Sequence, residues 1–142
     1  MKALIVYYSL TGTTRKLANR LADVLGCEVV NLPMFGSYKL DEGKKYDVVI
    51  VGTPIWLYAP GFPVSRFLSS NKDRLPAVAF FCTYQTTIGK SFEKMGRKCG
   101  KNPLGTLKLM GPEIGTEAGD LQVKQYIDQI NENLGSHRSD IA

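Results

Sequence analysis

The stretch that decides the fold runs from Ala3 to Thr14 and reads Ala-Leu-Ile-Val-Tyr-Tyr-Ser-Leu-Thr-Gly-Thr-Thr. Its first half, Ala3 to Tyr8, is apolar and rich in branched and aromatic residues, which is typical of a buried strand. The second half, Ser9 to Thr14, is a polar loop with four hydroxyl side chains and one glycine. A helical pattern that stops at Gly26 follows. Its apolar face is formed by Leu17, Leu21, Val24 and Leu25.

Further apolar runs predict the other strands of the same domain: Cys27 to Leu32, Asp47 to Gly52, Ala77 to Cys82 and, more weakly, Leu104 to Met110. Helices are predicted between and after them, one starting at Pro63, one after Gly89 and a last one capped by Asp120. The stretch from Pro33 to Tyr46 carries a proline and two glycines, which discourage a helix. This connection is therefore expected to be short or irregular.

Strands that are apolar throughout are buried on both faces and belong to parallel sheets. The alternation of such strands with helices predicts an α/β fold. We expect three layers around a doubly wound, five-stranded parallel sheet with strand order 2-1-3-4-5. Residues 1–134 would form this domain, and the polar residues 135–142 a flexible C-terminal tail.

The composition narrows the class of protein. The 142 residues are 44% apolar and 22% charged, as in soluble globular proteins. No apolar run approaches the roughly 20 residues of a membrane span, and the run after Lys2 lacks the features of a signal peptide. We expect a cytoplasmic protein without a membrane span.

The residues that most often carry metal or nucleophile chemistry are scarce. Three cysteines without a CxxC pair indicate neither a disulfide framework nor a zinc site. His137 is the only histidine, which leaves little material for a metal site or a His-based dyad. We predict no metal, no catalytic side chain, and buried reduced thiols at Cys27, Cys82 and Cys99.

In a doubly wound sheet, ligands bind outside the carboxyl ends of the strands, where the winding reverses. The first loop there offers hydroxyls, a glycine and the free N–H groups of a helix start, which hold a phosphate without a positive charge. A threonine that only caps the helix is the alternative, but the position directly after a buried strand favours a phosphate site. The residues of this predicted site are Ser9, Leu10, Thr11, Gly12, Thr13 and Thr14.

The pattern Ser-x-Thr-Gly-x-Thr at the end of a first strand resembles the phosphate loop of flavodoxins, which holds the phosphate of FMN. The resemblance covers nearly the whole chain, and the fifth strand leaves no room for the insertion of long-chain flavodoxins. It implies a short-chain flavodoxin-like protein with FMN as its cofactor.

Many flavodoxins have a glycine in the loop after the third strand, where a peptide flips to donate a hydrogen bond to the one-electron-reduced flavin. This sequence has Leu57 in that loop, where a flip would place a side chain in a costly backbone region, so strong stabilisation of the one-electron-reduced flavin is not expected.

The second loop places aromatic residues just beyond a strand end, where loops are normally polar. Trp56 either covers the edge of the core or stacks on a flat aromatic ligand, and we favour stacking by Trp56 over Tyr58. By resemblance, this loop flanks the flavin ring. Its predicted cofactor-binding residues are Thr53, Pro54, Ile55, Trp56, Leu57 and Tyr58.

The third loop is polar, neutral and rich in hydrogen-bond donors, which suits the pyrimidine edge of a flavin. Tyr84 is a further candidate for stacking. Because polar turns are common, the composition of this loop is weak evidence, and the prediction depends on the position of the loop after the fourth strand. Its predicted cofactor-binding residues are Thr83, Tyr84, Gln85, Thr86, Thr87 and Gly89.

Most of the net charge of +5 lies between Lys90 and Lys101, where five basic residues stand against one acidic residue, Glu93. Lys90, Lys94, Arg97 and Lys101 are spaced to share one side of a helix, which is either a solvated outer face or a docking surface for redox partners with acidic surfaces. No aromatic residues are interleaved with these charges, so nucleic acid is not expected as a partner.

Three functions remain. The first is an FMN-dependent electron carrier that shuttles electrons between redox partners. The second is an FMN-dependent NAD(P)H:quinone-type oxidoreductase on the same fold, which the leucine at position 57 and the scarce negative charge favour. The third is a binding module without flavin, against which Trp56 and the phosphate loop argue. Motifs of NAD-binding folds and P-loop enzymes are absent from the sequence.

Overall fold

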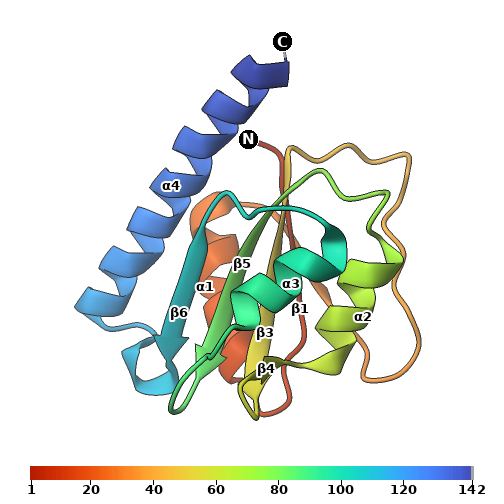
Figure 1. Cartoon of the computed structure of the whole chain (residues 1–142). Coiled ribbons are helices and arrows are strands. Elements are labelled where there is room, and N and C mark those ends of the chain that lie inside the picture. Colours follow the sequence, from red (N-terminus) through yellow and green to blue (C-terminus); the bar gives the residue numbers. More distant parts are fainter. Residues whose placement is uncertain (142) are drawn as a thin grey trace.

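A computed structural model describes the backbone of residues 1–141 and the side chains of residues 1–136. Five strands form a parallel sheet in the order β2-β1-β3-β5-β6, which is the predicted order once a short extra strand, β4, is counted (Figure 1). The doubly wound α/β fold is thereby confirmed. The strands are β1 (Ala3–Tyr7), β2 (Glu28–Asn31), β3 (Val48–Trp56), β4 (Ala59–Pro60), β5 (Ala77–Tyr84) and β6 (Thr106–Met110).

Helices cover both faces of the sheet. One face packs against α1 and α4 around Ile5 and Tyr126, and the other packs against α2 and α3 around Val6 and Phe67. Neighbouring residues of β1 thus enter opposite cores, which is why this strand is apolar throughout. The helices are α1 (Thr13–Leu25), α2 (Phe62–Ser70), α3 (Ser91–Cys99) and α4 (Glu117–Ile141), and a short 3-10 helix, η1 (Gly111–Glu113), follows β6.

The strand register brings the functional loops to one edge of the sheet. Tyr7 of β1 pairs with Gly52 of β3, and Pro54 pairs with Thr83 of β5. Tyr84 in turn pairs with Met110 at the end of β6. Because all these strands are parallel, their carboxyl ends lie together at the lower edge of the sheet in Figure 1.

The connection between β2 and β3 is irregular, as expected, and contains no helix. It is attached to the domain by Asn71, which is fully buried. The side chain of Asn71 accepts a hydrogen bond from the Leu40 N–H and donates to the Tyr38 carbonyl, both at 2.8 Å. The buried amide thus satisfies two backbone groups of a segment that has no helix of its own.

The last helix differs from the prediction at its start. The predicted cap at Asp120 is wrong, because α4 begins at Glu117 and the Gly119 N–H donates to Thr116 Oγ1 at 3.0 Å. Asp120 lies one turn inside the helix and forms an ion pair of 2.6 Å with Arg20 of α1. In sequence, an aspartate near a helix start can be either the cap or an ion-pair partner inside the first turns. Here Thr116 accepts the capping hydrogen bond, and Asp120 pairs with Arg20.

The segment expected to be a loose tail continues α4 through Ile141, so residue 134 is not the end of the helix. Side chains from His137 onward and Ala142 lie outside the described residues. Among residues 1–141, none of the helices combines the length and the apolar content of a membrane-spanning helix.

Candidate functional site

A cavity of about 800 Å³ opens at the carboxyl edge of the sheet, within the usual size range of small-molecule sites. All three predicted loops contribute to it. Its lining comprises Ser9, Leu10, Thr11, Thr13, Thr14, Pro54, Ile55, Trp56, Leu57, Tyr58, Thr83, Tyr84, Gln85, Thr86, Thr87, Met110, Gly111 and Pro112.

The first loop is shaped by a glycine and a serine. Gly12, at φ 96°, occupies the left-handed region that favours glycine, and α1 begins directly after it. Ser9 Oγ accepts hydrogen bonds from the backbone N–H groups of Gly12 and Arg15, at 3.1 and 3.2 Å. Both lone pairs of Ser9 are thus engaged, and its hydroxyl hydrogen remains available to a ligand.

Two backbone donors at the start of α1 have no protein partner. Within the described residues, the N–H groups of Thr13 and Thr14 make no hydrogen bond. The first N–H groups of a helix have no intrahelical acceptor and carry the positive end of the helix dipole. Since both threonines line the cavity, this helix start offers an anion two free donors.

The first and third loops are joined by a buried contact. Thr14 Oγ1 and Thr83 Oγ1 lie 2.7 Å apart, and these residues are 1% and 4% exposed. Thr14 belongs to α1 and Thr83 to β5, so this hydrogen bond fixes the helix start against the sheet edge. The relative position of the two loops is therefore set by the protein itself.

The second loop is a hairpin. Strand β3 extends through Trp56, which pairs with Ala59 of β4, and the two residues between them form the turn. Leu57 and Tyr58 have φ angles of 49° and 65°, the pattern of a type I′ turn, which normally requires glycine or asparagine. These are the two non-glycine residues with positive φ in the described chain, and each such residue costs roughly 1–2 kcal/mol.

Gly89 of the third loop and Ser91, the first residue of α3, lie against this turn. A Cβ at Gly89 would lie 3.2 Å from both the Cβ and the carbonyl oxygen of Tyr58, and at φ 56° a side chain would strain the backbone, so glycine favours this close approach. The Ser91 hydroxyl also lies 3.3 Å from this carbonyl oxygen, although its shorter hydrogen bond, of 2.5 Å, goes to the Ile88 carbonyl. The hairpin is therefore held against the loop after β5 in spite of its unfavourable backbone.

Trp56 serves the core as well as the cavity. Its ring meets the ring of Tyr8 edge-on, with centroids 5.6 Å apart, and lies 6.3 Å from the ring of Phe62. Tyr58 is 57% exposed beside it. These ring contacts support the interpretation that Trp56 covers the edge of the core. Stacking of Trp56 or Tyr58 on a ligand stays a prediction.

Three predicted binding residues are not part of the cavity lining: Gly12, Thr53 and Gly89. Thr53 Oγ1 donates to the Pro54 carbonyl and accepts from the Gly61 N–H, both at 2.8 Å. It thereby ties β3 to the start of α2 at the base of the hairpin. These three residues position the loops.

The sequence analysis missed the loop after β6. Met110, Gly111 and Pro112 line the cavity, and the Met110 N–H donates to the Glu113 carboxylate at 2.8 Å. A usable signal was present, because β6 is also a parallel strand whose carboxyl end must lie at the same edge.

The cavity lining contains no lysine, arginine, aspartate or glutamate. Cys82 is fully buried in β5, and burial raises the pKa of its thiol to about 12. At neutral pH this thiol is protonated and is a poor nucleophile. The site thus offers hydrogen-bond donors, aromatic surface and glycine turns, which suit binding better than acid–base or nucleophilic chemistry.

Comparison with protein families agrees with this geometry. A family model described as a flavodoxin domain matches residues 4–140. The chain belongs to the flavodoxin-domain family. A comparison with curated proteins finds no match to this flavodoxin-domain chain.

Solved structures show the same fold at low sequence identity. A flavoprotein from Lactobacillus acidophilus NCFM, in complex with FMN, is 22% identical and has a TM-score of 0.66, with 88% of this chain and 97% of that chain covered. A flavodoxin from the domain Archaea is 18% identical, with a TM-score of 0.67 and 94% and 99% covered. Oxidised flavodoxin 1 from Bacillus cereus is 18% identical, with a TM-score of 0.62 and 96% and 99% covered.

Proposed function

We propose that this flavodoxin-domain protein binds one FMN in the cavity and carries electrons between redox partners. The observation that carries the proposal is the pair of free N–H groups at Thr13 and Thr14, which open into a cavity with aromatic walls. A phosphate fits the helix start, and a flat ring fits between the second and third loops. The Lactobacillus acidophilus relative, whose structure holds FMN, supports this choice of ligand.

In this proposal the protein binds and positions, and the flavin, when bound, supplies reversible uptake and release of electrons. Thr13, Thr14 and the Ser9 hydroxyl hold the phosphate through hydrogen bonds. The hairpin from Trp56 to Ala59 borders one side of the ring, and residues 83–87 border its polar edge. The buried contact between Thr14 and Thr83 keeps the phosphate and ring subsites at a fixed separation.

A second candidate, an FMN-dependent NAD(P)H:quinone-type oxidoreductase, is favoured by the absence of acidic residues from the cavity lining. A nicotinamide nucleotide is an anion, and no carboxylate in this lining would repel it. NADPH oxidation by the purified protein alone would favour the enzyme. Reduction only in the presence of a separate reductase would favour the carrier.

The decisive experiment is the visible absorption spectrum of the purified protein after incubation with FMN and gel filtration. We expect a yellow complex with one FMN per chain. If the flavin elutes separately from the protein, the carrier and the oxidoreductase both fail, and the flavin-free binding module becomes the better description. Riboflavin, which lacks the phosphate, is the matched control and should bind more weakly.

A further inference from the structure

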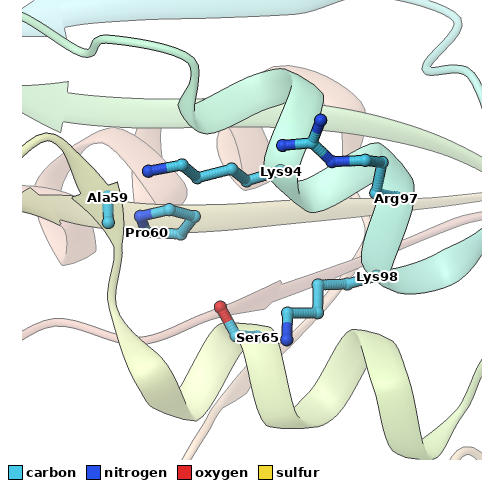
Figure 2. A pocket seen from close by; sticks show the side chains of 6 residues that line it. All are labelled: Ala59, Pro60, Ser65, Lys94, Arg97 and Lys98. Carbon is cyan, nitrogen blue, oxygen red and sulfur yellow. The ribbon is translucent and has the colours of Figure 1, made fainter.

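A second hollow lies on the other side of the hairpin. This basic pocket has a volume of about 510 Å³ and is lined by Ala59, Pro60, Ser65, Lys94, Arg97 and Lys98 (Figure 2). Figure 2 shows Lys94 extending from α3 toward Pro60 and Lys98 extending toward Ser65, while the Arg97 side chain lies along α3. The sequence analysis grouped Lys94 and Arg97 with Lys90 and Lys101, whereas the pocket takes Lys98 in place of those two.

The cations of the basic pocket have no acidic partners. Among the described residues, none of Lys94, Arg97 and Lys98 forms an ion pair within 4.0 Å. From position 48 to 101 the sequence has two acidic residues, Asp73 and Glu93, against eight lysines and arginines. Three positive charges around a hollow, with this excess of basic residues around them, attract an anionic surface.

An apolar projection stands beside this charge. Leu57, at the tip of the hairpin, is 94% exposed, and Tyr58 and Phe62 are 57% and 46% exposed. The hairpin is continuous: Trp56, Leu57 and Tyr58 line the cofactor cavity, and Ala59 and Pro60 line the basic pocket. The protein holds Leu57 in solvent on a left-handed backbone, which is a costly arrangement for a residue that packs on nothing.

We propose that the hairpin tip and the basic pocket together form the docking surface for an acidic redox protein. This inference rests on the proposed function, because it names the partner of the flavin site. The partner's carboxylates would enter the basic pocket, and Leu57 and Tyr58 would form the apolar centre of the contact. Docking there places the partner's redox centre against the wall of the cofactor cavity, a short distance from the flavin.

The test uses an acidic plant-type [2Fe–2S] ferredoxin as probe and the whole FMN-loaded protein. Two reduced ferredoxins each give up one electron, and the flavin takes up both electrons with protons from solvent. Stopped-flow absorbance then gives the second-order rate as a function of NaCl concentration. We expect the rate to fall steeply as salt rises, because opposite charges attract.

The variant Lys94→Glu should be about tenfold slower than the wild type at low salt and should lose most of the salt dependence. The substitution suits the first half of α3, and the new carboxylate can also pair with Lys98 one turn later. Lys124→Glu on α4, an exposed lysine of the opposite layer, is the matched control with the same net charge. It should react at nearly the wild-type rate.

Three results would overturn the docking surface: a wild-type rate that rises with salt, equal slowing by both variants, or Lys94→Glu reacting at the wild-type rate. In a further arm, inorganic pyrophosphate is titrated calorimetrically at constant ionic strength. Loss of pyrophosphate binding in Lys94→Glu with an unchanged ferredoxin rate would make the pocket a small-anion site and refute docking.

Titration of ferredoxin into flavin-free protein separates this inference from the proposed function, because docking that depends on Lys94 would survive a failure to bind FMN.

Discussion

The hydroxyl groups of Thr14 and Thr83 meet at 2.7 Å in the interior, 69 residues apart in sequence. Thr14 lies in the first turn of the helix that receives the phosphate in the proposed complex, and Thr83 lies next to the last residue of the strand that leads into the proposed ring-binding loop. Both residues are almost fully buried, so neither side chain has much access to water. In the proposed complex, this hydrogen bond would connect the subsite for the phosphate with the subsite for the ring.

Removing one partner of this bond should destabilise the protein. Thr14→Val or Thr83→Val leaves the other hydroxyl buried and unpaired, which lowers the free energy of unfolding by about 1–3 kcal/mol. The double variant should lose less than the sum of the two single losses. Urea denaturation of the flavin-free proteins measures all four corners of this cycle, and strict additivity would show that the two hydroxyls do not interact.

Glycine at position 57 should make the protein more stable than the leucine that is there. Leu57→Gly relieves the left-handed backbone and loses little buried surface, so the free energy of unfolding of the flavin-free protein should rise by about 1 kcal/mol. Leu10→Gly is the matched control, because Leu10 is an exposed leucine with an ordinary φ. That variant should be less stable than the wild type; equal effects at the two positions would argue against strain at Leu57.

The serine that shapes the first loop should matter for FMN more than for riboflavin. Ser9→Ala removes the acceptor of two backbone N–H groups and one donor to the phosphate, a loss of about 1.5–3 kcal/mol, or roughly 10- to 150-fold in the dissociation constant of FMN. Quenching of flavin fluorescence measures both affinities. The control variant Ser70→Ala, at an exposed serine of α2, should leave both affinities unchanged. If Ser9→Ala weakened riboflavin binding as much as FMN binding, Ser9 would not act through the phosphate.

The cysteines should differ in reactivity. The pKa of Cys82 is raised by burial from 9.0 to about 12, so at pH 8 only about one thiol in 10⁴ is the reactive thiolate. Cys27 is half-buried, and its thiol should react first with a disulfide reagent in the folded protein. In urea all three should react alike; fast labelling of Cys82 in the native state would contradict its burial.

The same pKa shift predicts a loss of stability in alkali. The unfolded thiol of Cys82 ionises near pH 9.0, whereas the folded one stays protonated to about pH 12. Between these values the unfolded state releases the proton first, so the free energy of unfolding falls as the pH rises. Below pH 9 the contribution of this thiol is complete, and Cys82→Ala should show a weaker decline between pH 9 and 12.

Local patterns carried most of the fold prediction. Runs such as Val48 to Val51 are apolar at every position because both faces of their strand are covered, and this signal requires no knowledge of the partner strands. The strand order followed from the rules for parallel sheets, and the binding edge followed from the order. The same rule applied to Met110 would have added the fourth loop of the cavity.

The sequence by itself determined the topology, the edge at which ligands bind and the hydroxyl-rich helix start at Ser9 to Thr14, because each depends on residues close together in the chain. Only the tertiary structure decided that Asp120 pairs with Arg20, that Trp56 packs on Tyr8, and that Leu57 and Tyr58 form a left-handed turn against Gly89. It also brought Thr14 to Thr83 and left Lys94 and Lys98 without an ion pair among the described residues. These relationships join segments that are distant in sequence, and the packing energy of the whole domain selects them over the local preference of each residue.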